Sequence, residues 1–263
     1  MSGDPIRELI LDLIYQGQTR KLNAPPIIGI AGAQGSGKSY QCRVIARVNP
    51  GVLHLSLDDY YMGKAARERL AAQTHPLFIT RGPPGTHYPR SLLYTLQHLN
   101  NPDEITELPR FDKAADDVVP QDQWSTFNGK PEAILVDGWC LGLKDCDALT
   151  DDPPLNALEA EEDADGRYRR AVRAALESYV DLFREIRTFV YLQAPSWDVV
   201  RKWRGEQEEE TLGRPLNTAD NARLDRFVMH YERITRAMMA GHHRARWIVH
   251  LDDKRRVVRV EGR

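Results

Sequence analysis

The stretch PPIIGIAGAQGSGKSY, at residues 25–40, decides the fold of this chain. Its second half, GAQGSGKS at 32–39, matches the phosphate-binding pattern GxxxxGK[ST] at every position. A continuous apolar run at 27–31 precedes the loop, and a stretch compatible with a helix follows at 40–48. A buried strand, a glycine-rich loop and a helix in this order predict a site for a nucleoside triphosphate.

Each residue type in the loop has a physical reason to be there. Glycines let the backbone wrap around a phosphate with its N–H groups pointing inward, and the N-terminus of the following helix adds about half a positive charge. We expect Lys38 to neutralise the β- and γ-phosphates and the Ser39 hydroxyl to bind Mg²⁺. ATP and Mg²⁺ are therefore the predicted cofactors, and the predicted phosphate-binding residues are Gly32, Ala33, Gln34, Gly35, Ser36, Gly37, Lys38, Ser39 and Tyr40.

Four more short apolar runs are spread along the chain, at residues 52–57, 133–136, 188–192 and 247–251. Stretches with apolar residues three and four positions apart lie between them, the longest at 168–186 and 224–238. Strands that alternate with helices indicate a parallel sheet covered on both faces. The predicted fold class is α/β, with a mainly parallel five-stranded core sheet flanked by helices.

Aspartates follow two of the predicted strands. Asp58 and Asp59 come after the run at 52–57, and Asp137 comes after the run at 133–136. The carboxyl ends of parallel strands meet at one edge of a sheet, so these acids are expected beside the phosphate loop. There an acid could bind Mg²⁺ or accept a proton from an attacking hydroxyl. Taken singly, each could equally be a turn or helix-capping aspartate.

Composition narrows the classes of protein that fit. The 36 basic and 38 acidic residues leave a formal charge of -2, without the basic excess of a dedicated nucleic-acid binder. Three cysteines without a CxxC pair indicate reduced thiols. No apolar window approaches the length of a membrane span, and charged residues interrupt the N-terminal helical pattern. We expect a cytoplasmic protein whose partner is a small molecule, without nucleic-acid or membrane binding.

Two segments interrupt the regular alternation. Residues 73–131 are rich in proline, glycine and charge and contain one short helical pattern, at about 91–99. Residues 144–165 are acidic and irregular. Long insertions in a compact domain tend to be functional. We therefore predict a single domain over residues 1–263, in which residues 73–131 form an acceptor-binding insertion.

Several motifs resemble one family of small-molecule kinases. LSLDDYY at 55–61 is similar to the second-strand motif of the uridine kinase, phosphoribulokinase and pantothenate kinase group. RGPPGTH at 81–87, LPRFDK at 108–113 and VDGW at 136–139 resemble, more specifically, D-glycerate 3-kinase and its bacterial and fungal P-loop relatives. The resemblance covers about residues 26–251. It implies a P-loop kinase fold and ATP-dependent phosphoryl transfer to a small metabolite, with D-glycerate as the first candidate.

The resemblance also implies roles for individual residues. Asp58 matches the catalytic base, and Asp137 matches an acid that holds the metal through water. The residues expected to meet the acceptor are Asp58, Tyr61, Arg81, His87, Arg110 and Asp112. Residues 197–217 match a lid region, and its Arg201 and Arg204 are catalytic candidates with Lys38, although a solvated helix face would also carry such charges.

The chain departs from the family pattern at two positions on the acceptor side. Tyr88 stands where the relatives commonly have aspartate, and Val118 where they often have arginine. Two alternatives therefore stay open. One is a kinase for another acceptor, such as a nucleoside, ribulose phosphate or a pantothenate-like molecule, and the other is a nucleotide-dependent switch or ATPase. Either could be a monomer or a homodimer.

Overall fold

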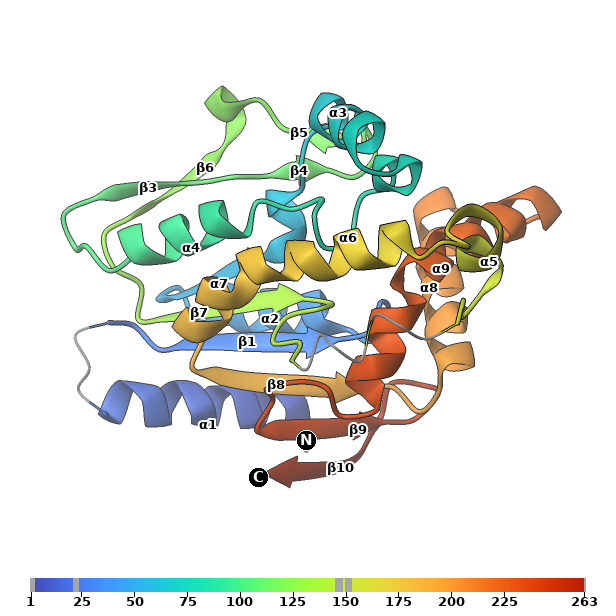
Figure 1. Ribbon diagram of the computed structural model, residues 1–263. Helices are drawn as coiled ribbons and strands as arrows, with labels where there is room; N and C mark the ends of the chain where they lie inside the picture. Colours follow the sequence, from blue (N-terminus) through green and yellow to red (C-terminus); the bar gives the residue numbers. More distant parts are fainter. Residues whose placement is uncertain (1–2, 21–23, 145–148, 150–152, 263) are drawn as a thin grey trace.

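The computed structural model describes residues 3–20, 24–144, 149 and 153–262. Its largest sheet has six strands in the order β10-β9-β8-β1-β7-β2 (Figure 1). The five strands from β9 to β2 are parallel, as the sequence predicted, and β10 pairs antiparallel with β9 at one edge. The bounds are β1 Ile27–Gly32, β2 Val52–Ser56, β7 Ala133–Gly138, β8 Thr188–Gln193, β9 Trp247–Leu251 and β10 Val257–Gly262.

The central strands are buried on both faces, because each face packs against helices. On one face, Ile28 and Ile30 of β1 belong to a core that includes residues of α1 (Pro5–Thr19) and α2 (Lys38–Val48). On the other face, Ile27 and Ala31 belong to a second core. Residues of α4 (Pro89–His98), α6 (Arg167–Leu176), α7 (Val180–Glu185) and α9 (Thr218–Met239) complete that second core.

Two helices lie beyond the carboxyl ends of the central strands (Figure 1). Helix α8 spans Trp197–Leu212; the Ser196 side chain caps its start, and Gly213, at a φ of 65°, ends it. Asn217 and Asp220 form a reciprocal capping box that starts α9. The helical pattern predicted over 168–186 is divided in the structure, because a 3₁₀ turn at Glu177–Tyr179 separates α6 from α7.

The segment between β2 and β7 contains more regular structure than its sequence indicated. It begins with a 3₁₀ turn, η1, at Leu57–Tyr60, and α3 (Lys64–Gln73). It also holds η2 (Pro76–Ile79), η3 (Gln121–Gln123), a β3–β6 pair (Ile105–Leu108 with Ser125–Asn128) and a short β4–β5 pair (Phe111–Asp112 with Asp117–Val118). In the acidic segment 144–165 the structure forms α5 (Ala157–Glu162), while 145–148 and 150–152 lie outside the described residues.

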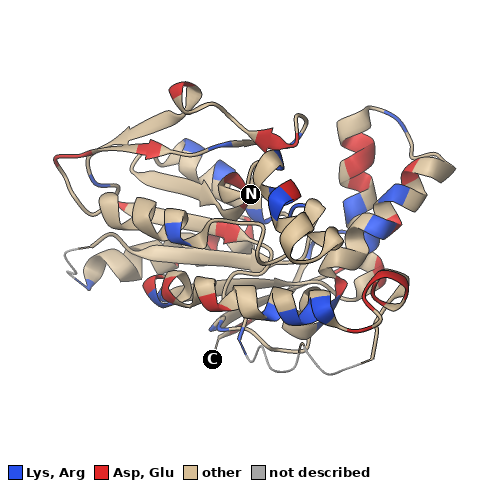
Figure 2. Ribbon diagram, turned by 45° about the horizontal axis from the view of Figure 1, so that its top comes forward, with Lys and Arg blue, Asp and Glu red and all other residues tan. Residues whose placement is uncertain are grey.

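Charged residues are unevenly distributed along the ribbon (Figure 2): α6 carries several basic residues, and the second half of α8 is acidic. Among the helices of the described residues, none combines the length and the apolar composition needed to cross a membrane.

Candidate active site

A cleft of about 890 Å³ opens at the carboxyl edge of the sheet. It is bounded by the phosphate loop, the ends of β2 and β7, the β4 segment and helices α8 and α9. Eleven residues that the sequence singled out line it together: Gln34, Gly35, Lys38, Ser39, Asp58, Tyr61, Arg81, Arg110, Asp112, Asp137 and Arg204. The parallel register explains this convergence, since Asp137 is paired with Ser56 on one side and with Ile30 on the other.

The loop at 32–39 has the features of an anion cradle. Gly37 has a φ of 91° and directly precedes α2 with no side-chain cap, so the first N–H groups of the helix are left for another acceptor. The Ser36 hydroxyl is buried and has no hydrogen-bond partner among the described residues. An unsatisfied buried hydroxyl is costly unless a ligand completes it. The loop therefore fits a phosphate chain.

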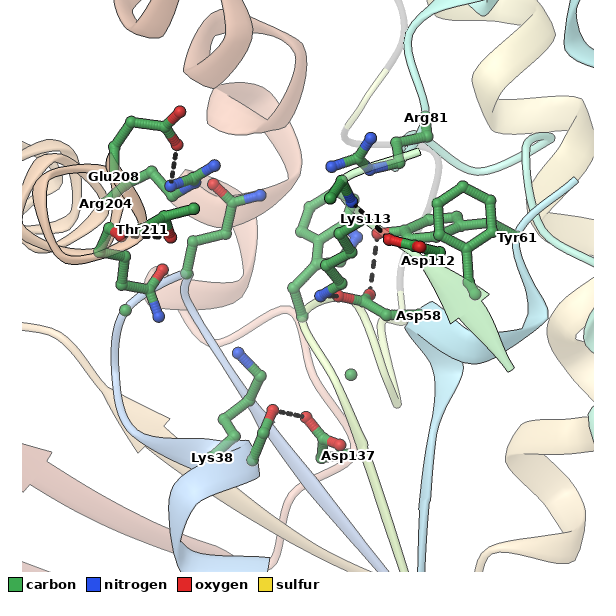
Figure 3. Close-up of a pocket in the computed structure, with 18 of the residues that line it drawn as sticks. Lys38, Asp58, Tyr61, Arg81, Asp112, Lys113, Asp137, Arg204, Glu208 and Thr211 are labelled. Atoms are coloured by element: carbon green, nitrogen blue, oxygen red, sulfur yellow. Dashed lines mark hydrogen bonds and ion pairs between the residues drawn. The ribbon is translucent and has the colours of Figure 1, made fainter. Parts of the chain in front are cut away.

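Lys38 lies at the floor of the cleft (Figure 3). Its Nζ donates one hydrogen bond, to the Ala33 carbonyl oxygen at 3.0 Å. Burial lowers the pKa of Lys38, and the carboxylates of Asp137 and Asp58 oppose that shift by favouring the charged form. An ammonium group has three donors, so Lys38 retains donors for the oxygens of a bound phosphate.

Asp137 lies close to Lys38 (Figure 3), and with Ser39 it supplies hard oxygen ligands to this part of the cleft. The Ser39 hydroxyl donates to Asp137 Oδ2 at 2.5 Å, and His54 Nε2 lies 2.8 Å from Asp137 Oδ1. Burial would raise the pKa of Asp137, but the hydrogen bonds and charges of His54, Lys38 and Ser39 lower it. The pair fits Mg²⁺, which takes few protein ligands and keeps phosphate and water for the rest. His54, on β2, orients this carboxylate.

Asp58 faces the same cleft from the 3₁₀ turn that follows β2 (Figure 3). Its Oδ1 accepts from the Tyr61 hydroxyl at 2.8 Å, and its Oδ2 accepts from Lys113 Nζ at 2.6 Å. Burial alone would raise the pKa of Asp58, but the charge and hydrogen bond of Lys113, with Tyr61, lower it to about 2. The sequence predicted Asp58 and Tyr61 here and missed Lys113.

Two arginines of the acceptor side line the cleft, and they differ in whether they have an ion-pair partner. Arg81 forms an ion pair with Asp116, which also accepts from the buried Arg67 at 2.6 Å. The Arg81 guanidinium lies 5.6 Å from the centroid of the Phe111 ring. Arg110, by contrast, forms no side-chain hydrogen bond or ion pair with the residues that the structure describes. The cleft thus presents a cation that is available to an anionic ligand.

Of the other two residues expected to meet the acceptor, His87 lies outside the cleft lining, whereas Asp112 is part of it. His87 is buried behind Tyr61, with ring centroids 4.5 Å apart, and its Nδ1 lies 2.7 Å from the Tyr179 hydroxyl. Burial lowers the pKa of His87 to about 4. Asp112 lines the cleft, but its Oδ1 accepts from the backbone of Ala114 and Ala115, an arrangement that shapes the turn carrying Lys113.

The two arginines predicted in the lid region have different surroundings. Arg204 lines the cleft, forms an ion pair with Glu208 at 2.8 Å and lies over the Phe227 ring (Figure 3). Arg201 is not among the lining residues, because it binds Asp225 at 2.7 Å and Asn221 at 2.8 Å on α9. Tyr40, predicted with the phosphate loop, is 56% exposed and lies outside the cleft lining.

Helix α8 and the β9–β10 turn support the phosphate loop from outside the cleft. A Cβ built on Gly35 would lie 2.5 Å from Trp203 Cβ, so only glycine allows this close approach. Arg255 Nε donates to the Gly35 carbonyl oxygen at 2.6 Å, and its guanidinium forms an ion pair with Glu206 at 2.7 Å. No local sequence signal connects positions 35, 203 and 255, because only the tertiary fold brings them together.

Comparisons with known proteins agree with this geometry. No protein-family model matches the sequence. The uncharacterized kinase mug58 of Schizosaccharomyces pombe is 29% identical over 243 residues, which cover 85% of this chain and 86% of that protein. The chloroplastic D-glycerate 3-kinase of Arabidopsis thaliana is 24% identical over 203 residues, 70% of this chain and 41% of the longer relative.

A solved structure has the same fold. The D-glycerate 3-kinase of Cryptococcus neoformans superposes with a TM-score of 0.75 at 19% identity, covering 99% of this chain and 100% of that one. The predicted α/β architecture is therefore confirmed. The chain has a P-loop kinase fold and resembles, in sequence and structure, kinases that include D-glycerate 3-kinases.

Proposed function

We propose that this protein is an ATP-dependent kinase that transfers the γ-phosphate to the hydroxyl of a small hydroxy acid, with D-glycerate as the first candidate. One observation carries the proposal: Lys38 of the phosphate loop and Asp58 line the same cleft, so donor and acceptor groups can meet there. The relatives that are named kinases support the reaction class, and the D-glycerate 3-kinases among them support the acceptor.

The cleft residues would divide the reaction between them. The loop N–H groups and Lys38 bind the β- and γ-phosphates, and Arg204 on α8 faces the charge that develops on the transferred group. The acceptor hydroxyl oxygen forms a bond to the γ-phosphorus as the bond to the β-phosphate oxygen breaks, and its proton passes to Asp58. Ser39 and Asp137 would hold Mg²⁺, which shields the phosphate charge when bound.

The charges on the acceptor side favour an anionic acceptor. Arg81, Arg110 and Lys113 all line the cleft near Asp58. A carboxylate can accept two parallel hydrogen bonds from a guanidinium group, which fixes its orientation as well as its position. In this proposal, residues 73–131 supply the acceptor side and residues 197–217 act as the lid of one domain. We place the reaction in the cytoplasm, where ATP and free metabolites occur.

The direct test is a panel of small acceptors incubated with ATP and Mg²⁺, with products identified by mass. We expect D-glycerate to give a phosphoglycerate and one ADP per product. Glycerol tests the need for a carboxylate, and ribulose 5-phosphate, pantothenate and a nucleoside test the other kinase classes. ADP release that is independent of every acceptor, and rises only with an added protein or nucleic acid, would contradict the proposal in favour of a nucleotide-dependent switch.

A further inference from the structure

The ion pair between Lys113 and Asp58 is the feature of the cleft that the proposed mechanism leaves unused. The proposed base accepts hydrogen bonds on both oxygens, at 2.8 Å from Tyr61 and at 2.6 Å from Lys113. An acceptor hydroxyl needs one of these oxygens as its own hydrogen-bond partner before it can lose its proton. Each carboxylate oxygen can still accept a second hydrogen bond, but the ammonium of Lys113 favours the charged form of Asp58 and so weakens it as a base, a state that we call masked.

Lys113 is the partner that is free to move. Its side chain is 59% exposed, against 27% for that of Asp58. Tyr61 is 4% exposed and held between the rings of His87 and Phe111. A lysine side chain carries an ammonium on four flexible methylene groups, so it can change partners at low cost.

A carboxylate on the acceptor is the group that can draw Lys113 away. Arg110 also lines the cleft and has no ion pair among the described residues, so an incoming anion meets this cation as well as Arg81, paired with Asp116, and Lys113, paired with the base. We propose that the carboxylate of the acceptor takes Lys113 from Asp58, so that binding the correct acid unmasks the base, and that Lys113 thereby selects hydroxy acids over neutral alcohols. This inference rests on the proposed function.

The consequence for the base follows from the charges that face it. Those groups are Lys113 from the turn after β4, Tyr61 and Asp59 from the η1 segment, His87 before α4, Lys38 from α2 and Tyr231 from α9. While Lys113 is paired, the pKa of Asp58 is about 2, which makes a weak base. Loss of that partner removes the largest of the causes that lower the pKa of Asp58, so the pKa rises and Asp58 becomes a stronger base, although the Tyr61 hydrogen bond remains.

The test compares the wild type with Lys113→Met on D-glycerate and on glycerol at saturating ATP. In the variant, Asp58 is already unmasked, but the carboxylate of D-glycerate has lost Lys113 as a partner. We expect kcat/KM for D-glycerate to fall by roughly tenfold or more, the worth of one charged hydrogen bond, while kcat/KM for glycerol stays level or rises. A merely structural role would lower both. Lys202→Met, on an exposed lysine of α8 with 56% side-chain exposure, is the matched control and should change neither.

The pH profiles supply a second readout between pH 4.5 and 8. In the wild type, Asp58 should give kcat/KM no acid limb in this range, because its pKa in the free enzyme is about 2, whereas kcat, which reports the complex with the acceptor, should show one. In Lys113→Met the two profiles should come together, and Lys113→Arg should separate them again. His87, with a pKa of about 4, is neutral through this range.

The outcomes are distinguishable. Turnover of D-glycerate with coincident wild-type profiles, or with equal losses on both acceptors in Lys113→Met, overturns the unmasking and leaves the proposed function standing. Phosphorylation of neutral alcohols alone by the wild type overturns both.

Discussion

At the scale of single residues, the proposed magnesium site depends on a histidine that is not among the residues lining the cleft. His54 lies 2.8 Å from Asp137 Oδ1 and so fixes the carboxylate whose other oxygen accepts from Ser39. Groups that orient a metal ligand typically contribute 10- to 100-fold in metal affinity. We expect His54→Ala to raise the Mg²⁺ concentration needed for half-maximal rate by roughly that factor.

A magnesium titration at fixed ATP checks this expectation. His250→Ala, on the parallel strand β9 and outside the cleft lining, is the matched control and should leave the magnesium dependence unchanged. An unaltered titration in His54→Ala would show that Asp137 needs no such support.

Residues whose role follows from a local sequence pattern were predictable, and residues whose role depends on a tertiary contact were not. Lys38 and Ser39 follow from the loop spacing alone, and Asp58 follows from its place after a strand together with the family resemblance. Lys113 and Arg255 acquire their roles only through partners 55 and 220 positions away. Charged residues on turns are common, and although Lys113 ends the LPRFDK motif, no spacing in the sequence assigns a role to either residue.

At the scale of elements, helix α8 carries two arginines that the sequence offered equally as catalytic candidates, and the structure distinguishes between them. Arg201 and Arg204 are three positions apart, yet Arg204 lines the cleft and Arg201 binds α9. A lid arginine that stabilises the transferred phosphoryl group contributes about 10³ to 10⁵ in rate. We expect Arg204→Ala to lower kcat by at least about 10²-fold and Arg201→Ala to change kcat only a few-fold.

Steady-state kinetics on the two variants measure this difference, with each serving as the control for the other. A larger loss in kcat for Arg201→Ala than for Arg204→Ala would mean that the lid turns a different face to the phosphates during the reaction.

Elements with strong periodicity were predictable, and those held by tertiary contacts were not. The five parallel strands and α9 follow from apolar runs and helical spacing. The β3–β6 and β4–β5 pairs are only two to four residues long and partly exposed, so they carry no periodic signal. Strand β10 is largely exposed, and pairing with β9 rather than burial defines it.

At the scale of the whole molecule, two buried histidines make stability depend on pH. Burial lowers the pKa of His87 and of His230 to about 4, whereas an unfolded histidine has a pKa near 6.5. Between these values the unfolded chain binds more protons, so the free energy of unfolding falls as the pH decreases from 6.5 to 4. The expected loss is roughly 3 kcal/mol per histidine by pH 4.

Urea unfolding at several pH values measures this slope, and His230→Gln should make it shallower by about one proton. Carboxylates with lowered pKa, such as Asp137, lose their contribution below about pH 5, so the slope between pH 6.5 and 5 reports the histidines. A free energy of unfolding that stays constant from pH 6.5 to 4.5 would contradict the burial of neutral histidines.

The central claim is that Asp58 takes the proton of the acceptor while the loop around Lys38 holds ATP. The most direct measurement is the kcat of Asp58→Asn on D-glycerate, together with its dissociation constant for ATP in the presence of Mg²⁺. The account predicts a loss of about 10² to 10⁴ in kcat, the contribution of a positioned base, and ATP affinity within a few-fold of the wild type. A variant that keeps more than about a tenth of the wild-type kcat would contradict the account, because a base that contributes so little is not the base.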